Sequence, residues 1–285
     1  MRWLVILVAC GALAQTFEQT PKDIKQGETL KVTASTNVQS ARMNGITIRL
    51  FAQDGGGWLG LMPVPVLTKP GDYSLAYLDE KDAVVHSTII HVADARYLKQ
   101  NITIAPAIAS LAPSPGEQQT VGNFRKEVSE TRYWKEPLTP PVPGCLTSPF
   151  GAMRLQNGKP TGDFHAGVDQ RGAAGTPIHP ITAGVVKLVK KYNLRGGTVA
   201  IDHGQGMESI YLHMSAFAAK EGQKVTPEDV IGYIGSTGRS TGPHVHWTLY
   251  VHGEAVNPGQ WMSLQNCPAA KAAPVKRKAS TAKGM

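Results

Sequence analysis

Residues 244–251, His-Val-His-Trp-Thr-Leu-Tyr-Val, decide the fold of this chain. Polar and apolar side chains alternate along this stretch, and a period of two predicts a β-strand with successive side chains on opposite faces. One face would enter a hydrophobic core and would carry Val245, Trp247, Leu249 and Val251. The same alternation places His244 and His246 together on the opposite face, where they are available for chemistry.

A second stretch with this pattern lies upstream, at residues 209–214, Ser-Ile-Tyr-Leu-His-Met. Its predicted apolar face carries Ile210, Leu212 and Met214. Tyr211 and His213 would then share the polar face, with Tyr211 either lining a groove or lying on the surface. Two strands that both present histidine on a polar face indicate a functional site rather than scattered surface histidines.

A carboxylate and a further histidine come from residues 165–169, His-Ala-Gly-Val-Asp. Imidazole nitrogens and carboxylate oxygens are ordinary zinc ligands, and a catalytic zinc site keeps three protein ligands and one water. His165, Asp169 and one histidine of the 244/246 pair would complete such a set. The four-residue spacing is weak by itself and becomes specific only in combination with the His-Val-His strand.

These three motifs, in this order, resemble the three signatures of the lysostaphin-type (LytM-type) zinc endopeptidases. The motifs are His165–Asp169, Tyr211-Leu212-His213-Met214 and Gly235–His246. Residues 148–154, 175–177 and 183–186 also match, so the resemblance covers roughly residues 145–265. Trp247 and Thr248 stand where the family often has an aromatic residue followed by Glu, and neither position is expected to hold a ligand.

The resemblance implies a β-sheet domain with one zinc ion in a groove. Carried over residue by residue, it makes His165, Asp169 and His246 the metal ligands, with His213 and His244 as catalytic residues beside the water at the metal. It also implies peptidoglycan as the partner, with hydrolysis of its peptide cross-bridges as the reaction. Two alternatives stay open: a non-catalytic envelope-binding regulator of another cell-wall hydrolase, and a secreted protease of non-wall proteins.

The rest of the chain organises around this domain. Thirty Gly and twenty Pro in 285 residues favour short strands and turns, so we expect a mainly all-β protein. The predicted parts are a small β-sandwich at 15–104, a linker at 105–144 with a candidate helix at 117–134, the peptidase domain at 145–267, and a basic disordered tail at 268–285. Strands are expected at 29–33, 46–51, 73–78, 84–92, 182–190, 198–202 and 230–234.

The charge distribution excludes a nucleic-acid-binding domain. The formal net charge is +8, but the last 18 residues hold five basic residues and no acid, and Arg2 adds another. Residues 15–267 therefore carry only +2, whereas a nucleic-acid-binding domain concentrates basic charge on its folded surface.

The amino terminus has the pattern of an export signal. Residues 3–13 form the only long apolar run, and it is too short to span a bilayer, which takes about 20 residues. Arg2, this run and the small residues at 12–14 are typical of a signal peptide, residues 1–14, which predicts a periplasmic or secreted protein. A lipid anchor at Cys10 is the alternative to soluble export.

Export would leave two cysteines in an oxidising compartment, Cys145 and Cys267. They bracket the predicted peptidase domain, so we expect a disulfide that joins its two ends, with two unrelated buried thiols as the alternative. The oligomeric state, the bond that is cut and the division of roles between the two catalytic histidines are left open by the sequence.

Overall fold

The computed structural model describes residues 15–36 and 38–268, and it confirms a predominantly β fold. The predicted signal peptide and nearly all of the predicted tail lie outside the described residues. Within the described residues the α-helices are two short ones, α1 (Pro106–Ala109) and α2 (Glu117–Phe124), together with a 3-10 turn at Pro258–Gln260. None of the helices in this part of the chain is long and apolar enough to cross a membrane.

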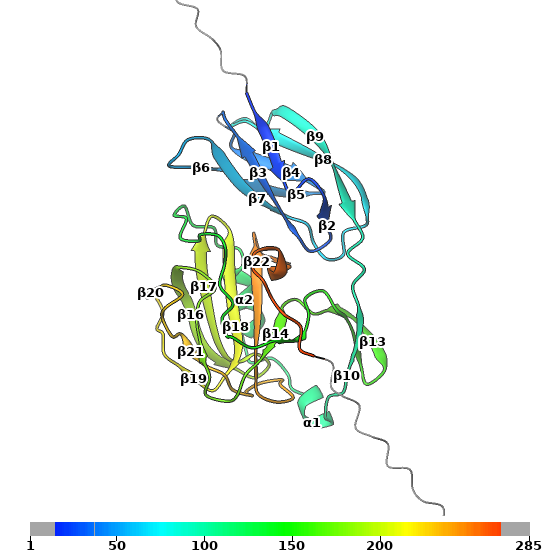
Figure 1. The fold of residues 1–285 in the computed structure, drawn as a ribbon, viewed down its shortest axis with the longest axis vertical. Coiled ribbons are helices and arrows are strands. Elements are labelled where there is room, and N and C mark those ends of the chain that lie inside the picture. Colours follow the sequence, from blue (N-terminus) through cyan, green and yellow to red (C-terminus); the bar gives the residue numbers. More distant parts are fainter. Residues whose placement is uncertain (1–14, 37, 269–285) are drawn as a thin grey trace, which may run out of the picture.

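The N-terminal module consists of two sheets with an apolar core between them (Figure 1, upper lobe). One sheet has the order β1-β3-β7-β6, with bounds Phe17–Thr20, Thr29–Ala34, Trp58–Pro63 and Phe51–Ala52. The other has the order β2-β9-β8-β4-β5, with bounds Ile24–Lys25, Val84–Ala93, Gly71–Leu78, Ser40–Met43 and Ile46–Arg49. Leu30, Leu75 and Ile90 are among the side chains buried between the two sheets.

An eight-stranded sheet forms the second lobe. Its order is β11-β14-β22-β18-β17-β16-β20, with β23 paired to β22. The bounds in that order are Leu146–Ser148, Val168–Arg171, His244–Val251, Met207–Met214, Gly196–Gly204, Gly184–Tyr192, Lys224–Val225 and Glu254–Val256. The two strands predicted to carry histidines, β18 and β22, are therefore direct neighbours at its centre.

Two small three-stranded sheets border the large one. One has the order β10-β12-β13, with bounds Lys99–Ile102, Met153–Gln156 and Lys159–Phe164. The other has the order β15-β21-β19, with bounds Pro177–Ile178, Gly232–Tyr233 and Ala216–Phe217. Strand β10 pairs in parallel with β12, so a segment that precedes the predicted linker forms a sheet with the second lobe.

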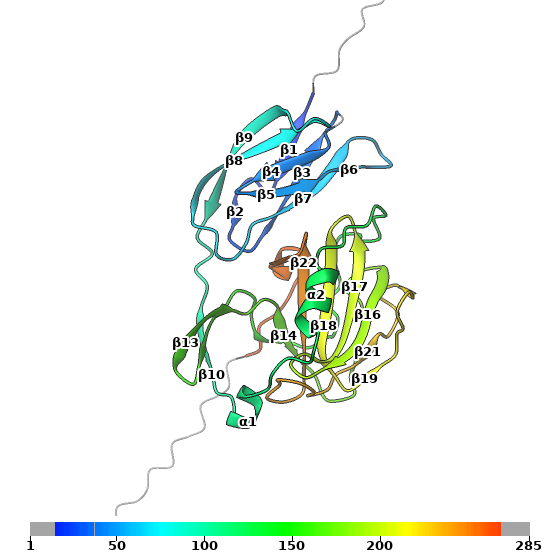
Figure 2. The same ribbon diagram turned by 180° about the vertical axis from the view of Figure 1, so that it is seen from behind.

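The helix predicted at 117–134 is shorter than expected, because α2 ends at Phe124. Within the helix Val121 and Phe124 are buried, whereas Val128 lies beyond its end and is exposed. Beyond the helix the backbone hydrogen-bonds to the large sheet instead: the Gln205 amide donates to the Ser129 carbonyl and the Tyr133 amide donates to the His203 carbonyl. Figure 2 shows α2 lying over one face of the large sheet.

The segment between the two lobes packs against the large sheet. Trp134, Leu138 and Val142 are buried in the hydrophobic core of the second lobe, together with Val121 and Phe124 of α2. The predicted domain boundaries stay a prediction, but residues 105–144 include core residues and are not only a spacer.

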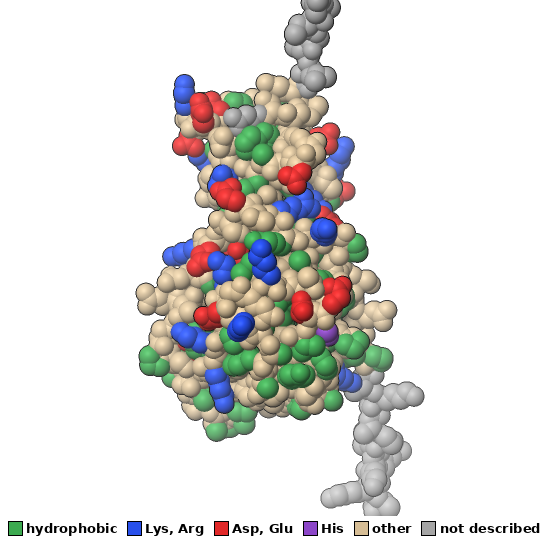
Figure 3. All heavy atoms as spheres, turned by 90° about the vertical axis from the view of Figure 1, so that its left-hand side faces the viewer, with side chains coloured by type: hydrophobic (Ala, Val, Ile, Leu, Met, Phe, Trp, Pro, Cys, Tyr) green, Lys and Arg blue, Asp and Glu red, His purple; other side chains and the backbone are tan. Residues whose placement is uncertain are grey.

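The lobes meet at a narrower waist, where acidic and basic side chains gather on the face seen in Figure 3. Lys31 of β3 forms an ion pair with Glu136 at 2.5 Å. The backbone of Thr29 exchanges two hydrogen bonds with the Gln260 side chain, each 2.7 Å long. These polar contacts link the N-terminal module to the end of the second lobe.

A disulfide joins Cys145 to Cys267, as the sequence led us to expect, with their Cα atoms 4.9 Å apart. It links the start of the predicted domain at 145–267 to its end across 122 positions of sequence. Next to it the Leu146 amide donates to the Gln265 carbonyl, and the Cys267 amide donates to the Leu146 carbonyl. The two ends of this region are thus fastened together.

Candidate active site

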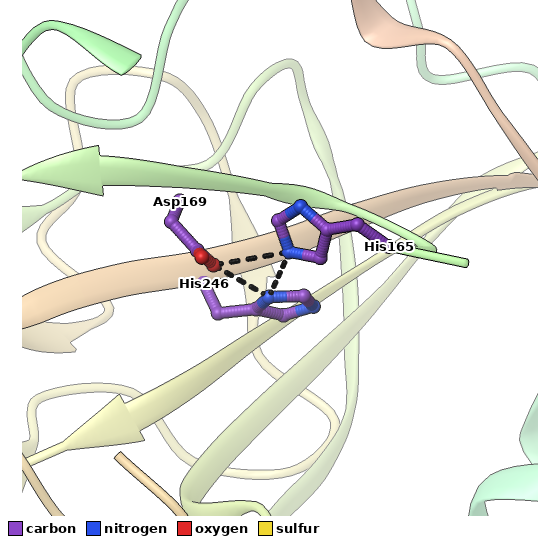
Figure 4. A group of neighbouring side chains, drawn as sticks. All are labelled: His165, Asp169 and His246. Carbon is purple, nitrogen blue, oxygen red and sulfur yellow. Dashed lines mark hydrogen bonds and ion pairs between the residues drawn. The ribbon is translucent and has the colours of Figure 1, made fainter. Parts of the chain in front are cut away.

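Asp169 and His246 lie directly opposite each other on neighbouring antiparallel strands, β14 and β22. Residues paired in this way have their side chains on the same face of the sheet. Asp169 Oδ1 is 2.8 Å from His246 Nδ1 (Figure 4). The alternation read from residues 244–251 therefore places the His246 ring correctly, with Trp247 buried on the opposite face.

His165 completes a group of three. It lies between β13 and β14, four residues before Asp169, and its Nε2 is 3.2 Å from Asp169 Oδ1 and 3.0 Å from His246 Nδ1. Gly167 lets the chain pass close to β22, because a Cβ at this position would lie 2.3 Å from the Trp247 carbonyl oxygen. One ligand atom from each of His165, Asp169 and His246 thus lies within 4.8 Å of the others.

In the His165 and His246 rings, the nitrogen that points away from Asp169 has its own hydrogen-bond partner, and this partner fixes the orientation of the ring. His165 Nδ1 is 2.9 Å from the Pro149 carbonyl oxygen and 3.0 Å from Ser148 Oγ. His246 Nε2 is 3.3 Å from Thr248 Oγ1. Protons on these outer nitrogens leave His165 Nε2 and His246 Nδ1 unprotonated and facing Asp169, which is the form that binds a metal ion.

His213 reaches the same group through a β-bulge. Gly197 and Val199 of β17 pair with Met214 and Tyr211 of β18, so β18 has one extra residue between its two pairs. His213 there has φ +65°, in the left-handed region. The bulge turns its ring toward the site, where the ring centroid lies 5.0 Å from that of His244 and 6.1 Å from that of His246.

The expectation for Tyr211 is wrong. Tyr211 pairs with Trp247, so it points to the same side of the sheet as that core residue rather than toward the histidines. It is fully buried, and its hydroxyl accepts a hydrogen bond from the Ile181 amide and another from Ser209 Oγ. Regular alternation assigned Tyr211 and His213 to one face, and the bulge between them separates the two.

His244 stands beside the three-residue group without joining it as closely. Its Nε2 is 3.7 Å from Asp169 Oδ1. Its Nδ1 is 2.8 Å from the Gly242 carbonyl oxygen, and His213 Nδ1 is likewise 2.8 Å from the Thr237 carbonyl oxygen. The loop at residues 235–243 therefore orients both rings through their Nδ1 atoms.

This loop approaches the sheet closely at Gly196 and Gly238. A Cβ on Gly196 would lie 2.4 Å from the Thr237 carbonyl oxygen, and a Cβ on Gly238 would lie 2.4 Å from the Gly196 nitrogen. Thr237 Oγ1 also accepts a hydrogen bond from the Gly197 amide at 2.9 Å. The loop is thus fixed to β17, and a side chain on Gly196 would displace the Thr237 carbonyl that orients His213.

Burial and neighbouring charges determine the protonation states in the group. Burial, with the nearby His246 and His244, lowers the pKa of His213 to about 3. Burial lowers the pKa of His246 to about 4, despite the opposing effect of Asp169. Burial alone would raise the pKa of Asp169, but its contacts with His165 and His246 outweigh burial and hold that pKa well below its ordinary value. At neutral pH the site therefore combines the Asp169 carboxylate with neutral rings at His213 and His246.

The structure thus gathers all five residues singled out in the sequence: His165, Asp169, His213, His244 and His246. Sequence reasoning missed the groups that orient the rings, namely the Ser148 hydroxyl, the Thr248 hydroxyl and the carbonyls of Pro149, Thr237 and Gly242. Only Thr248 left a signal, since it lies two residues after His246 on the same strand face. The Gly242 carbonyl belongs to a residue two positions before His244, and the remaining groups come from segments 16–24 positions away from the rings that they orient.

The fold and site define a metallopeptidase, and comparison with known proteins identifies the family. Residues 163–258 match Peptidase family M23, and this part of the chain is a domain of that family. The match contains all five site residues. The predicted resemblance to lysostaphin-type peptidases is therefore confirmed.

Curated relatives carry the same domain. Over 121 residues the chain is 40% identical to the DD-carboxypeptidase/endopeptidase Mpg of Neisseria meningitidis, which covers 42% of this chain and 28% of that protein. Over 134 residues it is 39% identical to the peptidoglycan DD-endopeptidase ShyA of Vibrio cholerae, covering 47% and 30% of the two chains. The matched region thus spans less than a third of either relative.

A solved structure resembles the chain over most of its length. It is the crystal structure of a Pseudomonas aeruginosa protein described as an M23 peptidase. The TM-score is 0.64 at 28% sequence identity, and the alignment covers 83% of this chain and 94% of that one. Coverage of this extent includes a large part of the N-terminal half in addition to the peptidase domain.

Proposed function

We propose that this protein is a zinc-dependent endopeptidase that hydrolyses peptide cross-bridges of bacterial peptidoglycan in the cell envelope. The observation that carries the proposal is the convergence of His165 Nε2, Asp169 Oδ1 and His246 Nδ1, separated from one another by 2.8–3.2 Å. The disulfide supports an oxidising compartment. The names of the relatives Mpg and ShyA support peptidoglycan as the substrate.

The donor set fits zinc. Two imidazole nitrogens and one carboxylate oxygen are the borderline ligands that Zn²⁺ prefers, and three protein ligands leave one position for water or substrate. The two imidazoles present unprotonated nitrogens toward Asp169, since their other nitrogens face carbonyl or hydroxyl oxygens. When bound here, zinc would lower the pKa of a water molecule and polarise the scissile carbonyl.

His213 and His244 perform the proton transfers. Both rings lie at the edge of the three-residue group and keep Nδ1 hydrogen-bonded to carbonyl oxygens, so each offers Nε2 to the reacting atoms. His213 is neutral at pH 7 because of its lowered pKa, and it is therefore able to accept a proton. One ring takes the proton of the attacking water, and a protonated ring delivers a proton to the departing amine, help typically worth about 10²–10⁴-fold.

The test uses zinc-loaded protein and purified peptidoglycan sacculi, with the products separated and identified by mass. We expect cross-linked muropeptide dimers to decline and the corresponding monomers to accumulate. A zinc chelator should stop the reaction, and restored zinc should recover it. The masses of the new ends also identify the bond that is cut.

The matched control is His244→Ala, which leaves the three proposed ligands in place. It should bind zinc and release monomers about 10²–10⁴-fold more slowly than wild type. A zinc-loaded wild-type protein that leaves all cross-linked dimers intact would contradict the proposal and favour a non-catalytic role in the envelope.

A further inference from the structure

Strand β10 follows the N-terminal module in sequence, yet it forms part of the wall beside the metal-ligand group. It pairs in parallel with β12, and the Met153 amide donates to the Leu98 carbonyl at 2.8 Å. The segment around β12 is joined directly to His165: the Gly151 amide donates to the His165 carbonyl, and the His165 amide donates to the Ala152 carbonyl. Movement of β10 would therefore be transmitted to the backbone of His165.

Tyr97, just before β10, fixes this segment against both lobes. Its hydroxyl donates to the Gln26 carbonyl at 2.5 Å. Its ring occupies the space where a side chain on Gly151 would lie, since a Cβ there would come within 2.0 Å of the ring. A Cβ on Gly27 would likewise lie 2.1 Å from the Tyr97 hydroxyl. Two glycines, one from each lobe, thus make room for a single tyrosine.

A side-chain relay leads from β10 to the His165 ring. Ser148 Oγ donates to Gln100 Oε1 at 2.7 Å, and the same Oγ lies 3.0 Å from His165 Nδ1. Ser148 is 5% exposed and His165 is 2% exposed, so water has little access to these bonds. Because the hydroxyl proton is given to Gln100, a lone pair of Oγ is directed at His165 Nδ1 and accepts its proton.

We propose that Gln100 is a positioning residue that acts through Ser148 to hold His165 in the tautomer and orientation that bind the metal. The inference rests on the proposed metal site. Gln100 fixes the direction of the Ser148 hydroxyl, the hydroxyl and the Pro149 carbonyl hold the proton on Nδ1, and Nε2 is left as the ligand atom. Without Gln100 the hydroxyl rotates freely and competes as a donor toward Nδ1, which favours the wrong tautomer.

The experiment measures the zinc dissociation constant of the full chain by competition with a chelator. Outer partners of metal ligands typically change metal affinity by 10–100-fold. We expect Ser148→Ala and Gln100→Met each to weaken zinc binding about 10-fold, and Gln100→Glu, whose carboxylate still accepts the hydroxyl proton, to stay within about 2-fold of wild type. In the Ser148→Ala background, Gln100→Met should have no further effect. Ser148→Ala and Gln100→Met each test the relay, so the proposal remains testable if one of the two variants does not fold.

Two controls separate positioning from general stability. Gln156→Leu changes a glutamine in the same small sheet whose side chain makes no hydrogen bond among the described residues, and it should leave zinc affinity unchanged. Nitrogen NMR of the His165 ring in metal-free protein at pH 8 should show Nδ1–H in wild type and Gln100→Glu, and a tautomer mixture in Gln100→Met. The relay is overturned if Gln100→Met binds zinc like wild type, or if its effect persists unchanged without Ser148. A wild-type protein that binds no zinc would overturn the proposed function itself.

Discussion

The two lobes are both β-sheet structures, but they bury different kinds of side chain. Among the described residues of 15–104, the buried polar side chains are Thr29 and Thr68. The peptidase lobe buries ionisable groups, namely His165, Asp202, His203, Glu208 and His213, along with Glu117. The N-terminal lobe is therefore held together mainly by apolar packing, whereas the lobe that contains the candidate site retains buried polar groups that reduce its stability unless each finds a partner.

The comparison also separates two kinds of polar burial within the peptidase lobe. The histidines of the site have partners on their outer nitrogens, as described above. His203 is similarly satisfied, with Nδ1 2.8 Å from the Ala183 carbonyl oxygen and Nε2 2.7 Å from Ser209 Oγ. Glu208 differs, since neither of its carboxyl oxygens has a hydrogen-bond partner in the described structure. Experiments that alter each class of buried residue test this division.

The largest effect is expected from the site itself. His246→Ala and Asp169→Ala should lose both zinc and activity, because each removes a proposed ligand. His213→Ala and His244→Ala should keep nearly stoichiometric zinc while kcat falls by about 10²–10⁴-fold, since only a proton-transfer group is lost. Metal analysis beside sacculus hydrolysis measures both quantities. The assignment is wrong if His244→Ala empties the site and His246→Ala retains its metal.

Next in size is the effect of the disulfide, which fastens only the peptidase lobe. Replacing Cys145 and Cys267 by serine should lower the free energy of unfolding by about 2–5 kcal/mol, since a long closed loop strongly restricts the unfolded chain. Denaturant unfolding of the oxidised protein and the double variant measures this. Equal midpoints with and without the bond would show that the neighbouring backbone hydrogen bonds alone hold the two ends together.

The sequence was sufficient for the parts of the site that depend on local periodicity. The alternation at 244–251 placed His246 and buried Trp247 correctly, because a regular strand has a period of two. It failed for Tyr211, because one extra residue in β18 reverses the faces, and a bulge leaves no local mark in a stretch of ordinary strand-forming residues. The end of α2 was missed for a similar reason, since remote strands supply hydrogen-bond partners for the residues that follow it.

Groups that act at long range in the chain could not be predicted at all. Gln100 and Ser148 are 48 positions apart, and Ser148 and His165 are 17 apart. Nothing in an isolated glutamine or serine indicates that its partner is a hydroxyl or an imidazole. Only the parallel pairing of β10 with β12 brings them together, and pairing between distant strands is set by tertiary packing.

A third experiment tests the apolar core of the N-terminal module. Leu75→Ala in β8 should lower the free energy of unfolding by about 2–5 kcal/mol, because Leu75 is completely buried between the two sheets and its removal leaves a cavity. Zinc affinity should be unchanged in the folded variant. The control is Ile89→Ala on β9, which is 64% exposed and should change stability by less than about 0.5 kcal/mol. A change in zinc affinity on Leu75→Ala would show that the core of this lobe influences the site.

The most specific effect, which develops only as the pH rises, concerns Glu208. Burial, followed by the nearby Asp202, raises its pKa to about 9, whereas an ordinary glutamate titrates near 4.5. Between these values the folded protein holds a proton that the unfolded chain has released. Stability therefore decreases as pH rises from about 4.5 to about 9, by at most about 1.4 kcal/mol per pH unit. Below the lower value both states are protonated and the effect disappears.

Glu208→Gln keeps the shape of the protonated acid and removes its titration. It should match wild type near pH 4.5 and become progressively more stable than wild type toward pH 9, as measured by urea unfolding at several pH values. Glu228→Gln changes an exposed glutamate in the same lobe and should give no such divergence. A difference that is constant with pH would mean that Glu208 is ionised in the folded protein. Glu208 would then not be a neutral buried acid, and the distinction between buried groups with and without hydrogen-bond partners would not account for its behaviour.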